Sequence, residues 1–305
     1  MTAPDVSGVP DVAELTARLD AAGYLADEGL ATALHLALAL GRPLLLEGEP
    51  GVGKTAAAKA LAQALGAPFI RLQCYEGLTA GEALYDWNYR RQMLAIRLAE
   101  SRGDKLEDDD LFTEEFLLER PVLRAVRHAG PTPPVLLIDE VDRADDEFEA
   151  FLLEILSDYT VSVPEVGTFS AEKPPVVVIT SNRTRDVHDA LKRRCLYHWV
   201  EHPSFDREVA IVRLRVPACS DQLARQVAAA VETMRDLNLY KPPGVAETID
   251  WATALGRLGV TQLDERSVAS TLGTVLKYRE DHQRVETHGL ADIVKQAFER
   301  STRAG

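Results

Sequence analysis

Cysteine is scarce in this chain, and the placing of its few cysteines excludes two kinds of small protein. The three among 305 residues, Cys74, Cys195 and Cys219, are odd in number, widely spaced and outside any CxxC motif. Neither a disulfide framework nor a zinc site is indicated, and a reducing cytoplasm fits this usage. The first residues also lack the basic and apolar regions of a secretory signal, so we expect a cytoplasmic protein.

A long apolar run and an excess of positive charge are missing as well. The longest apolar-leaning run, residues 30–48, is broken by His35, Gly41, Arg42 and Pro43, so no uninterrupted part reaches the roughly 20 residues of a membrane span. We therefore expect no membrane span. Acidic residues outnumber basic ones 48 to 34, a formal net charge of -14. Because the net charge repels nucleic acid and anionic membranes on average, we also expect no bulk nucleic-acid binding.

Hydrophobic residues, by contrast, make up 46% of the chain, which is enough for a large core. Short apolar runs alternate with helical patterns, as is typical of a parallel sheet with crossover helices, so we predict an α/β fold. Its five strands are expected at Leu44–Glu47, Phe69–Gln73, Val135–Asp139, Val176–Thr180 and Leu196–Val200. We predict a flexible N-terminus over residues 1–10, the α/β domain over 11–203, and an all-helical domain over 204–305.

Helical periodicity is clear in two regions. Between Asp145 and Tyr159, apolar residues recur at i, i+3, i+4, i+7 and i+8, which predicts one buried face with Glu149 and Glu154 pointing away from it. The C-terminal part contains segments with a helical period and no strand pattern, at residues 206–216, 221–237, 247–259 and 266–282.

A phosphate-binding motif lies between the first predicted strand and the helix after it. The sequence fits G-x-x-x-x-G-K-[ST] in the required strand-to-helix context. Its glycines let successive N–H groups turn inward, Lys54 reaches the β- and γ-phosphates, and the Thr55 hydroxyl ligates Mg²⁺. The predicted ATP-binding residues are Gly48, Glu49, Pro50, Gly51, Val52, Gly53, Lys54, Thr55 and Ala56.

Two later strands end in polar residues that suit the same chemistry. After one buried run, Asp139 would hold Mg²⁺, and Glu140 would orient and deprotonate the attacking water. Acidic residues also end buried strands without such a role, but the upstream phosphate motif favours catalysis. At the end of the next strand, Asn182 would hold the same water or a γ-phosphate oxygen, with a helix N-cap or turn asparagine as the alternative.

These motifs, followed by a helical C-terminal part, resemble those of an AAA+ ATPase over nearly the whole chain. Within that superfamily the chain is similar to the MoxR family, whose members carry a long insertion after the second strand and a hairpin before the third motif-bearing strand. The corresponding segments are Tyr75 to Arg120 and Thr160 to Pro175. The sequence at residues 72–77, 85–92 and 241–255 resembles that of the branch associated with maturation of carbon monoxide dehydrogenase and related molybdenum hydroxylases.

The resemblance implies ATP and Mg²⁺ as cofactors and a role for each motif residue. Lys54 and Thr55 correspond to Walker A, Asp139 and Glu140 to Walker B, and Asn182 to sensor 1. It also implies an arginine finger that acts on a neighbouring subunit's nucleotide, here Arg194 with Arg193 beside it, although two solvated arginines at a helix end are the alternative. A finger acting in trans implies a ring, commonly a homo-hexamer; the further partners implied are a protein with a von Willebrand factor A (VWA) domain and a metalloenzyme client.

One position departs from the family's pattern. Many members open a lid helix with Gly-Ala-Ser-Pro-Arg, which supplies a second sensor arginine, whereas this chain has Gly244, Val245, Ala246, Glu247 and Thr248. Arg257 and Arg266 are near in sequence but do not match the motif. The lid sensor therefore has no assigned residue.

The insertion contains a stretch that is rich in aromatic residues and arginine. Tyr85, Trp87 and Tyr89 alternate there beside Arg90 and Arg91. Extra length at such a place is usually functional. Three interpretations are open: packing of a helix and its aromatics on the sheet domain, which is the most economical, a protein-contact surface on the ring, and a stacking platform for single-stranded nucleic acid.

The sequence thus predicts an ATP-driven protein remodeller, in which hydrolysis changes the angle between the two domains. An AAA+ nucleic-acid motor or initiator is the second hypothesis, and the net acidity of the chain counts against it. A slow nucleotide-dependent switch or scaffold is the third, because the lid sensor departs from the pattern.

Overall fold

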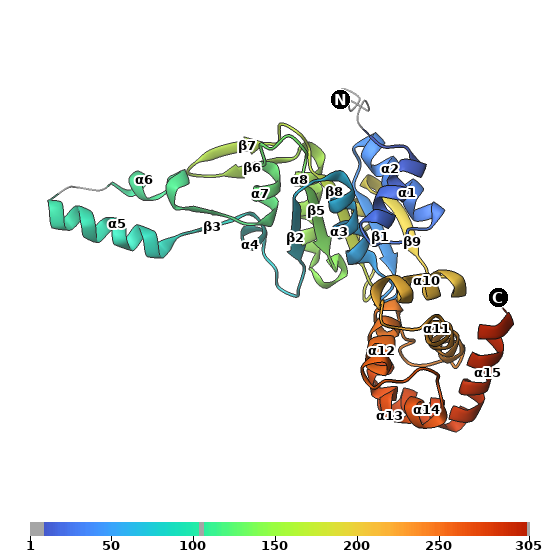
Figure 1. The fold of residues 1–305 in the computed structure, drawn as a ribbon. Coiled ribbons are helices and arrows are strands. Elements are labelled where there is room, and N and C mark those ends of the chain that lie inside the picture. The colour runs from blue at the N-terminus through green and yellow to red at the C-terminus, as the bar shows by residue number, and fades with distance from the viewer. Residues whose placement is uncertain (1–8, 104–106, 304–305) are drawn as a thin grey trace. The chain divides into compact units, whose positions relative to one another are not determined.

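The computed structural model describes residues 9–103 and 107–303 (Figure 1). Residues 1–8 of the predicted flexible N-terminus lie outside these ranges. Contacts between Cα atoms divide the chain into two compact units. The first comprises residues 1–22, 26–47 and 55–199, and the second comprises residues 23–25, 48–54 and 200–305.

The first unit is built on a five-stranded sheet with the order β2-β5-β8-β1-β9. Its strands are β1 (Leu44–Gly48), β2 (Phe69–Gln73), β5 (Val135–Asp139), β8 (Val176–Ser181) and β9 (Leu196–Val200). The pairs β2·β5, β5·β8 and β8·β1 are parallel. Every residue of β1 and β5 is buried, which explains their continuous apolar runs. The predicted α/β class is confirmed, and each strand is found within one residue of its predicted bounds.

Helices cover this sheet, and aspartate side chains cap the first turn of several of them. The helices are α1 (Val12–Ala21), α2 (Glu28–Leu40), α3 (Lys54–Leu65), α7 (Pro121–Val126), α8 (Asp146–Asp158) and α9 (Asp189–Arg194). The apolar face of α8 packs in a core with alternate residues of β2, β5 and β8. Asp145 caps α8 by accepting a hydrogen bond from the N–H of Phe148 at 2.8 Å.

One expectation for α8 was wrong. Glu149 is 1% exposed rather than directed to solvent, whereas Glu154 is exposed as predicted. The Glu149 carboxylate accepts from the N–H of His188 at 2.8 Å and pairs with Arg185. Periodicity could not predict this burial, because the partners come from the loop after β8, far away in sequence.

The predicted insertion between β2 and β5 is present and has its own small sheet. It contains α4 (Ala80–Leu84), β3 (Tyr85–Trp87), α5 (Tyr89–Arg102), α6 (Asp108–Leu111), a 3₁₀ turn η1 (Glu114–Phe116) and β4 (Leu117–Glu119). Strands β3 and β4 pair in antiparallel fashion. The predicted hairpin before β8 is also present, as antiparallel β6 (Thr160–Val163) and β7 (Gly167–Ser170).

The aromatic stretch divides between a strand and a helix, not along one helix as expected. Trp87, on β3, is 9% exposed and stacks edge-on against Phe112, with ring centroids 5.1 Å apart. Tyr85 packs against the same core, while Tyr89, the first residue of α5, is 63% exposed. Asn88 sets this boundary because its side chain accepts from the N–H of Arg91 and caps α5. Packing therefore accounts for two of the three aromatics.

The second unit is helical, as predicted for this part of the chain. Its helices are α10 (Phe205–Arg215), α11 (Asp221–Arg235), α12 (Val245–Arg257), α13 (Glu265–Val275), α14 (Arg279–His288) and α15 (Leu290–Arg303). The core gathers on α11 and includes the fully buried Trp251, whose Nε1–H donates to Thr271 Oγ1 at 2.7 Å. The single helix predicted over residues 266–282 is broken, because Leu276 adopts an extended conformation and is buried in this core.

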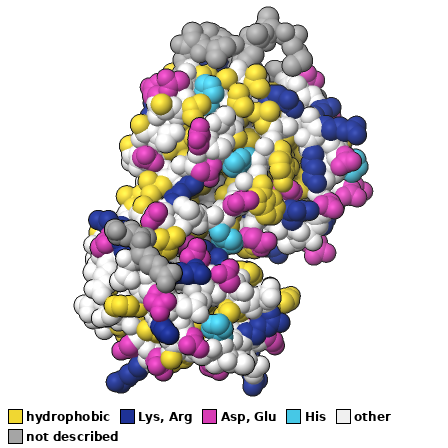
Figure 2. All heavy atoms as spheres, turned by 90° about the vertical axis from the view of Figure 1, so that its right-hand side faces the viewer, with side chains coloured by type: hydrophobic (Ala, Val, Ile, Leu, Met, Phe, Trp, Pro, Cys, Tyr) yellow, Lys and Arg dark blue, Asp and Glu magenta, His cyan; other side chains and the backbone are white. Residues whose placement is uncertain are grey.

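The charges on the described surface are mixed. On the face shown in Figure 2, acidic and basic side chains are interspersed. In the insertion, Arg91 pairs with Glu115 at 2.7 Å and Arg120 with Asp86 at 2.9 Å. Among the described residues, no helix has both the length and the apolar composition needed to cross a bilayer.

Candidate nucleotide and metal site

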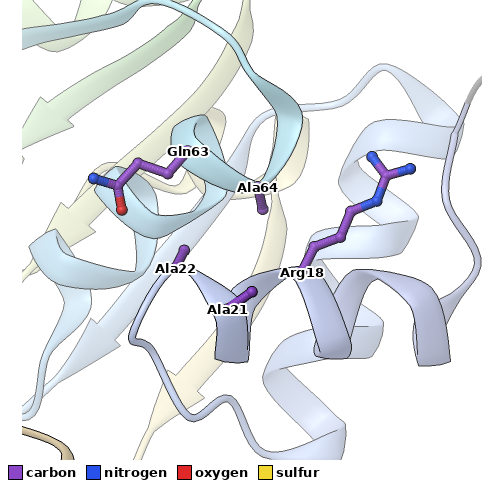
Figure 3. A pocket seen from close by; sticks show the side chains of 5 residues that line it. All are labelled: Arg18, Ala21, Ala22, Gln63 and Ala64. Carbon is purple, nitrogen blue, oxygen red and sulfur yellow. The ribbon is translucent and has the colours of Figure 1, made fainter.

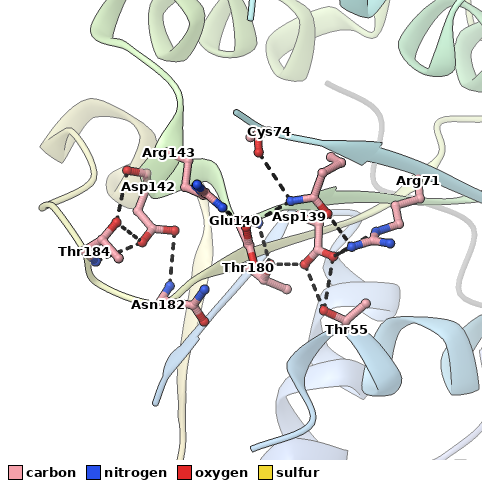
Figure 4. Close-up of polar contacts among 11 residues, drawn as sticks. Thr55, Arg71, Cys74, Asp139, Glu140, Asp142, Arg143, Thr180, Asn182 and Thr184 are labelled. Atoms are coloured by element: carbon pink, nitrogen blue, oxygen red, sulfur yellow. Dashed lines mark hydrogen bonds and ion pairs between the residues drawn. The ribbon is translucent and has the colours of Figure 1, made fainter. Parts of the chain in front are cut away.

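Asp139 is the centre of a polar network at the end of β5. Its side chain is 2% exposed and accepts hydrogen bonds from donors on three other elements (Figure 4). The hydroxyl of Thr55, on α3, lies 2.9 Å from Oδ1, and the Thr180 hydroxyl, on β8, lies 2.5 Å from the same oxygen. The third donor is Arg71 on β2, whose Nε lies 2.9 Å from Oδ2. These donors meet because carboxyl ends of parallel strands share one edge of the sheet.

The two predicted Mg²⁺ ligands are thus brought together. A hydroxyl at the start of a helix beside a carboxylate is an oxygen donor set that suits Mg²⁺, which typically takes one or two protein carboxylates and completes its shell with phosphate oxygens and water. Among residues 9–103 and 107–303, no group of three or more His, Cys, Asp and Glu side chains gathers as a metal centre. Thr55 and Asp139 are oxygen donors of the kind that fits Mg²⁺.

Glu140 follows directly in a conformation that is unusual for its residue type. Its φ of 56° and ψ of 51° lie in the left-handed region, which is sparsely populated outside glycine. Its N–H donates to Thr180 Oγ1 at 2.9 Å, and its carboxylate accepts from Gln73 Nε2 at 3.1 Å and Arg143 Nη1 at 3.3 Å. The surroundings thus hold both the backbone and the side chain of the predicted base.

The field at this strand end is negative. Burial, followed by the nearby charges of Asp139, Asp142 and Glu140, raises the pKa of the Cys74 thiol to about 12. Cys74 is therefore a neutral thiol at physiological pH and makes no nucleophile here. The same carboxylates favour a bound cation.

Asn182 lies at the end of β8, where the sequence predicts sensor 1. Its backbone N–H donates to Asp142 Oδ1 at 3.2 Å, and no hydrogen bond of its side-chain amide is found among the described residues. Asp142 also accepts from the N–H of Thr184 at 2.9 Å and from its hydroxyl at 2.6 Å. The buried Asp142 therefore ties the loop after β8 to the turn η2 (Val141–Arg143) after β5.

Four residues of this network were missed by the motif analysis: Arg71, Gln73, Asp142 and Thr180. The signal for two of them was present in β2, where Arg71 and Gln73 are polar residues at alternate positions of an otherwise apolar strand. The parallel register pairs Gln73 with Asp139 and Arg71 with Leu137, so both share a sheet face with Asp139. That register could not be read from the sequence.

The phosphate-binding loop, residues 48–54, belongs to the second unit by its contacts. The Lys54 ammonium is 6% exposed and donates to the carbonyl oxygens of Gly48 and Glu49, both at 2.8 Å. Gly51 has a φ of 81°, and its carbonyl oxygen accepts from the N–H of Ala246 at 3.2 Å. A Cβ on Gly244 would lie 2.8 Å from Gly51 Cα, so the close approach of these two backbone segments requires glycine.

The segment without a sensor arginine, residues 244–248, is called the lid slot here. Gly244 precedes α12, and its N–H donates to Glu247 Oε2 at 3.0 Å. The hydroxyl of Thr248 donates to Glu208 Oε1 at 2.6 Å, and Arg235 grips the two oxygens of Glu208 at 2.8 and 2.7 Å. Where the resemblance would place an arginine, this chain thus has a buried threonine, which is hydrogen-bonded to the ion pair of Glu208 and Arg235.

His202 lies in the same unit and has a buried ring nitrogen, Nδ1, without a hydrogen-bond partner among the described residues. Burial, with the positive charges of Arg235 and Lys54, lowers its pKa to about 4. The imidazole is therefore neutral at physiological pH.

The two candidate finger residues end α9 and have different surroundings. The Arg194 guanidinium donates to the carbonyl oxygen of Leu153 and to the hydroxyl of Ser157, both on α8. Arg193 is exposed, and no side-chain partner for it is found within the described ranges. Arg42 donates to the carbonyl oxygen of Arg193 at 3.0 Å and so fixes this helix end.

A separate open pocket of about 500 Å³ lies beside the C-terminal ends of α1 and α3 (Figure 3). It is lined by Arg18, Ala21, Ala22, Gln63 and Ala64 and contains none of the predicted site residues. Arg18 is already paired with Glu14 at 2.5 Å. The pocket lies at the C-terminal end of α3, whereas Lys54 of the nucleotide motif begins that helix.

Comparison with known proteins relates the chain to a broad family. Residues 43–195, just over half of the chain, match the family model described as AAA domain (dynein-related subfamily). A Lon protease of Halothermothrix orenii is 34% identical over 119 residues, 37% of this chain and 12% of that protein. A Lon protease of Mycolicibacterium smegmatis is 25% identical over 268 residues, 82% of this chain and 31% of that protein.

The chain therefore spans less than a third of the length of these curated relatives, and the likeness carries no protease activity to it. Among solved structures, a putative ATPase from Cytophaga hutchinsonii matches with a TM-score of 0.44 and 14% identity, over 95% of this chain and 91% of that one.

Proposed function

The chain belongs to the AAA domain family (dynein-related subfamily), and we propose that it is a Mg²⁺-dependent ATPase that couples hydrolysis to protein remodelling. The observation that carries this proposal is the hydrogen bond between Thr55, on the phosphate-binding helix, and the buried Asp139, which directly precedes Glu140. Such a combination of hydroxyl, carboxylate and adjacent base is what hydrolysis of a nucleoside triphosphate requires.

Each residue has a separate task in the proposed reaction. The N–H groups of residues 48–54 and the Lys54 ammonium would bind the phosphates, and Thr55 with Asp139 would hold Mg²⁺. Mg²⁺, when bound, neutralises charge on the β- and γ-phosphates. Glu140 would orient a water molecule for in-line attack and accept its proton, and the Asn182 amide would hold that water or a γ-phosphate oxygen.

We further propose a ring, commonly a hexamer, in which a neighbour supplies the arginine finger. Arg193 and Arg194 are the proposed pair, and Arg193 is the more available one because Arg194 already bonds to α8. A guanidinium at the γ-phosphate stabilises transition-state charge and contributes about 10³ to 10⁵ in rate.

The resemblance to the MoxR family supports the finer proposal of a chaperone for metalloenzyme maturation. The client would be a carbon monoxide dehydrogenase-like enzyme, and a VWA-domain protein would cooperate in the cytoplasm. The insertion between β2 and β5 and the β6–β7 hairpin supply surfaces for such partners. On α5, Tyr89, Met93 and Leu94 are more than half exposed, which suits protein contact.

A slow nucleotide-dependent switch is the second candidate, and the lid slot favours it. Thr248 is committed to Glu208, so this segment offers no cation to a γ-phosphate. Steady-state turnover separates the two candidates, because a switch would bind ATP and release phosphate at less than about one turnover per minute, far below the usual range of enzymes. A nucleic-acid motor is not favoured, since Arg91 and Arg120 are paired with acids.

Capture of partners by a hydrolysis-blocked variant tests the remodelling proposal. Glu140→Gln protein is purified with ATP from its native cells after nuclease treatment, and the bound proteins are identified by mass spectrometry, with Lys54→Ala as the control that cannot bind ATP. Recovery of a VWA-domain protein and a metalloenzyme subunit with Glu140→Gln alone is expected. Recovery of replication or recombination proteins that are lost on nuclease treatment would contradict it.

A further inference from the structure

Asp139 is bound by a residue that carries a full positive charge of its own. Arg71 contacts the Oδ2 atom of Asp139 twice, through Nε at 2.9 Å and Nη2 at 2.5 Å. The Asp139 side chain is 2% exposed, whereas that of Arg71 is 46% exposed. A buried carboxylate with a half-exposed guanidinium on one oxygen already has a counter-ion.

The other donors to Asp139 differ from Arg71 in one chemical respect. A threonine hydroxyl can donate its proton to Asp139 and still offer a lone pair to a metal ion, so Thr55 serves carboxylate and cation together. A guanidinium has donors only and no lone pair. Close to a divalent cation it can only repel, and in a largely buried site that repulsion is weakly screened.

We propose that Arg71 competes with Mg²⁺ for Asp139 and thereby sets the Mg²⁺ concentration at which the site loads. This inference rests on the proposed ATPase function and adds the regulation of its metal site. The half-exposed Arg71 side chain has solvent to move into when the cation binds. When Mg²⁺ displaces Arg71 from Asp139, the hydrogen bond from Arg71 Nη2 to the Gln73 amide oxygen would break as well.

Arg143 provides a matched control at the same sheet edge. It is also an arginine, with 59% of its side chain exposed, and it pairs with Glu140 at 3.3 Å. In the described structure its guanidinium bonds to Glu140 and not to Asp139. Loss of its charge therefore reports the general field of the site, while loss of Arg71 reports direct competition as well.

Metal binding to the full-length protein loaded with ADP tests the proposal without relying on turnover. Free Mn²⁺, the spectroscopic probe, is measured by electron paramagnetic resonance, and Mg²⁺ is then titrated against it. In Arg71→Gln the dissociation constant for Mn²⁺ should fall by about threefold to tenfold, in the range expected for a partly exposed charge pair. In Arg143→Gln it should change by less than about twofold, and Arg71→Lys, which keeps the charge, should stay within about twofold of wild type.

An unchanged or higher Mn²⁺ dissociation constant in Arg71→Gln overturns the proposal and leaves Arg71 a residue that positions Asp139. Binding of ADP without metal is measured first for every variant, together with its melting temperature. Wild-type protein that fails to bind ADP refutes the proposed function itself, whereas intact ADP binding with equal metal affinities refutes only the role of Arg71. If Arg71→Gln does not fold, Arg71→Met, which keeps the stem, takes its place in the same titration.

Discussion

The strand-end site and the lid slot differ in how closely they follow the sequence pattern that the resemblance to the MoxR family implies. The strand-end site brings the motif residues Thr55, Asp139 and Glu140 together with Thr180, in a network centred on the buried Asp139. The lid slot, residues 244–248, has the helix start but a threonine in place of the arginine. We propose that the strand-end site keeps its groups for chemistry, whereas Thr248, at the expected arginine position of the lid slot, forms a buried hydrogen bond. The comparison predicts that variants in the two regions fail in different ways.

Removal of the phosphate-binding charge should have the largest effect. Lys54→Ala should weaken ATP binding at least about 100-fold and abolish turnover, because the ammonium forms charge-assisted bonds to phosphate. Calorimetric titration with ATP measures this, and Lys59→Ala, at an exposed position of the same helix, is the control that should bind normally. Unchanged affinity in Lys54→Ala would refute the assignment of the phosphate site.

Loss of the trans finger should spare binding and slow hydrolysis. Arg193→Ala should keep ATP affinity and lose about 10³ in turnover, since the guanidinium acts on the transition state. Mixing it with Glu140→Gln subunits should restore part of the activity, because each subunit supplies what the other lacks. Arg194→Ala should lose less. Full activity of Arg193→Ala alone would remove this residue from the proposed finger.

A change in the ion pair that holds Thr248 of the lid slot should reduce the stability of the protein. Arg235→Met leaves Glu208 buried without its cation, and breaking a buried pair in this way costs about 3 to 5 kcal/mol of unfolding free energy. Arg213→Met, which breaks an exposed pair with Asp221, should cost less than about 1 kcal/mol. Urea unfolding measures both. Equal stability of the two variants would show that the buried Glu208 pair contributes no more than the exposed pair, and the contrast between the regions would fail.

The smallest effect should appear as a pH dependence of stability. The pKa of His202 is about 4 in the folded protein and about 6.5 when unfolded, so the unfolded chain binds the extra proton between these values. The contribution of His202 to stability should be complete above about pH 6.5 and fall by on the order of 3 kcal/mol as the pH drops toward 4. His202→Gln should make the melting temperature less dependent on pH between pH 4 and 6.5. An equal slope in both proteins would assign the dependence to other groups.

The sequence predicted which polar residues lie together at the strand ends, because their places follow a rule of position, and their roles stay predictions. Asp139, Glu140 and Asn182 end neighbouring parallel strands, and parallel strand ends meet at one edge. The α/β class and the strand bounds came from apolar runs that burial on both faces requires. Partners that depend on register or on distant loops were not predicted, which is why Arg71 and the burial of Glu149 were missed.

The insertion shows a second limit of periodicity. Tyr85, Trp87 and Tyr89 alternate along the sequence, but the cap at Asn88 changes strand into helix between the second and the third. The helix break at Leu276 is similar, since burial of one apolar side chain outweighed helical continuity. Local patterns identify elements and leave such junctions to tertiary packing.

Phosphate release by purified wild-type and Glu140→Gln proteins, with ATP and Mg²⁺ in excess, tests the central claim most directly. We expect many turnovers for the wild type, and release at least about 100-fold slower for Glu140→Gln with ATP affinity retained, because general-base catalysis contributes about 10² to 10⁴ in rate. Equal rates for the two proteins, or no ATP binding by either, would contradict it.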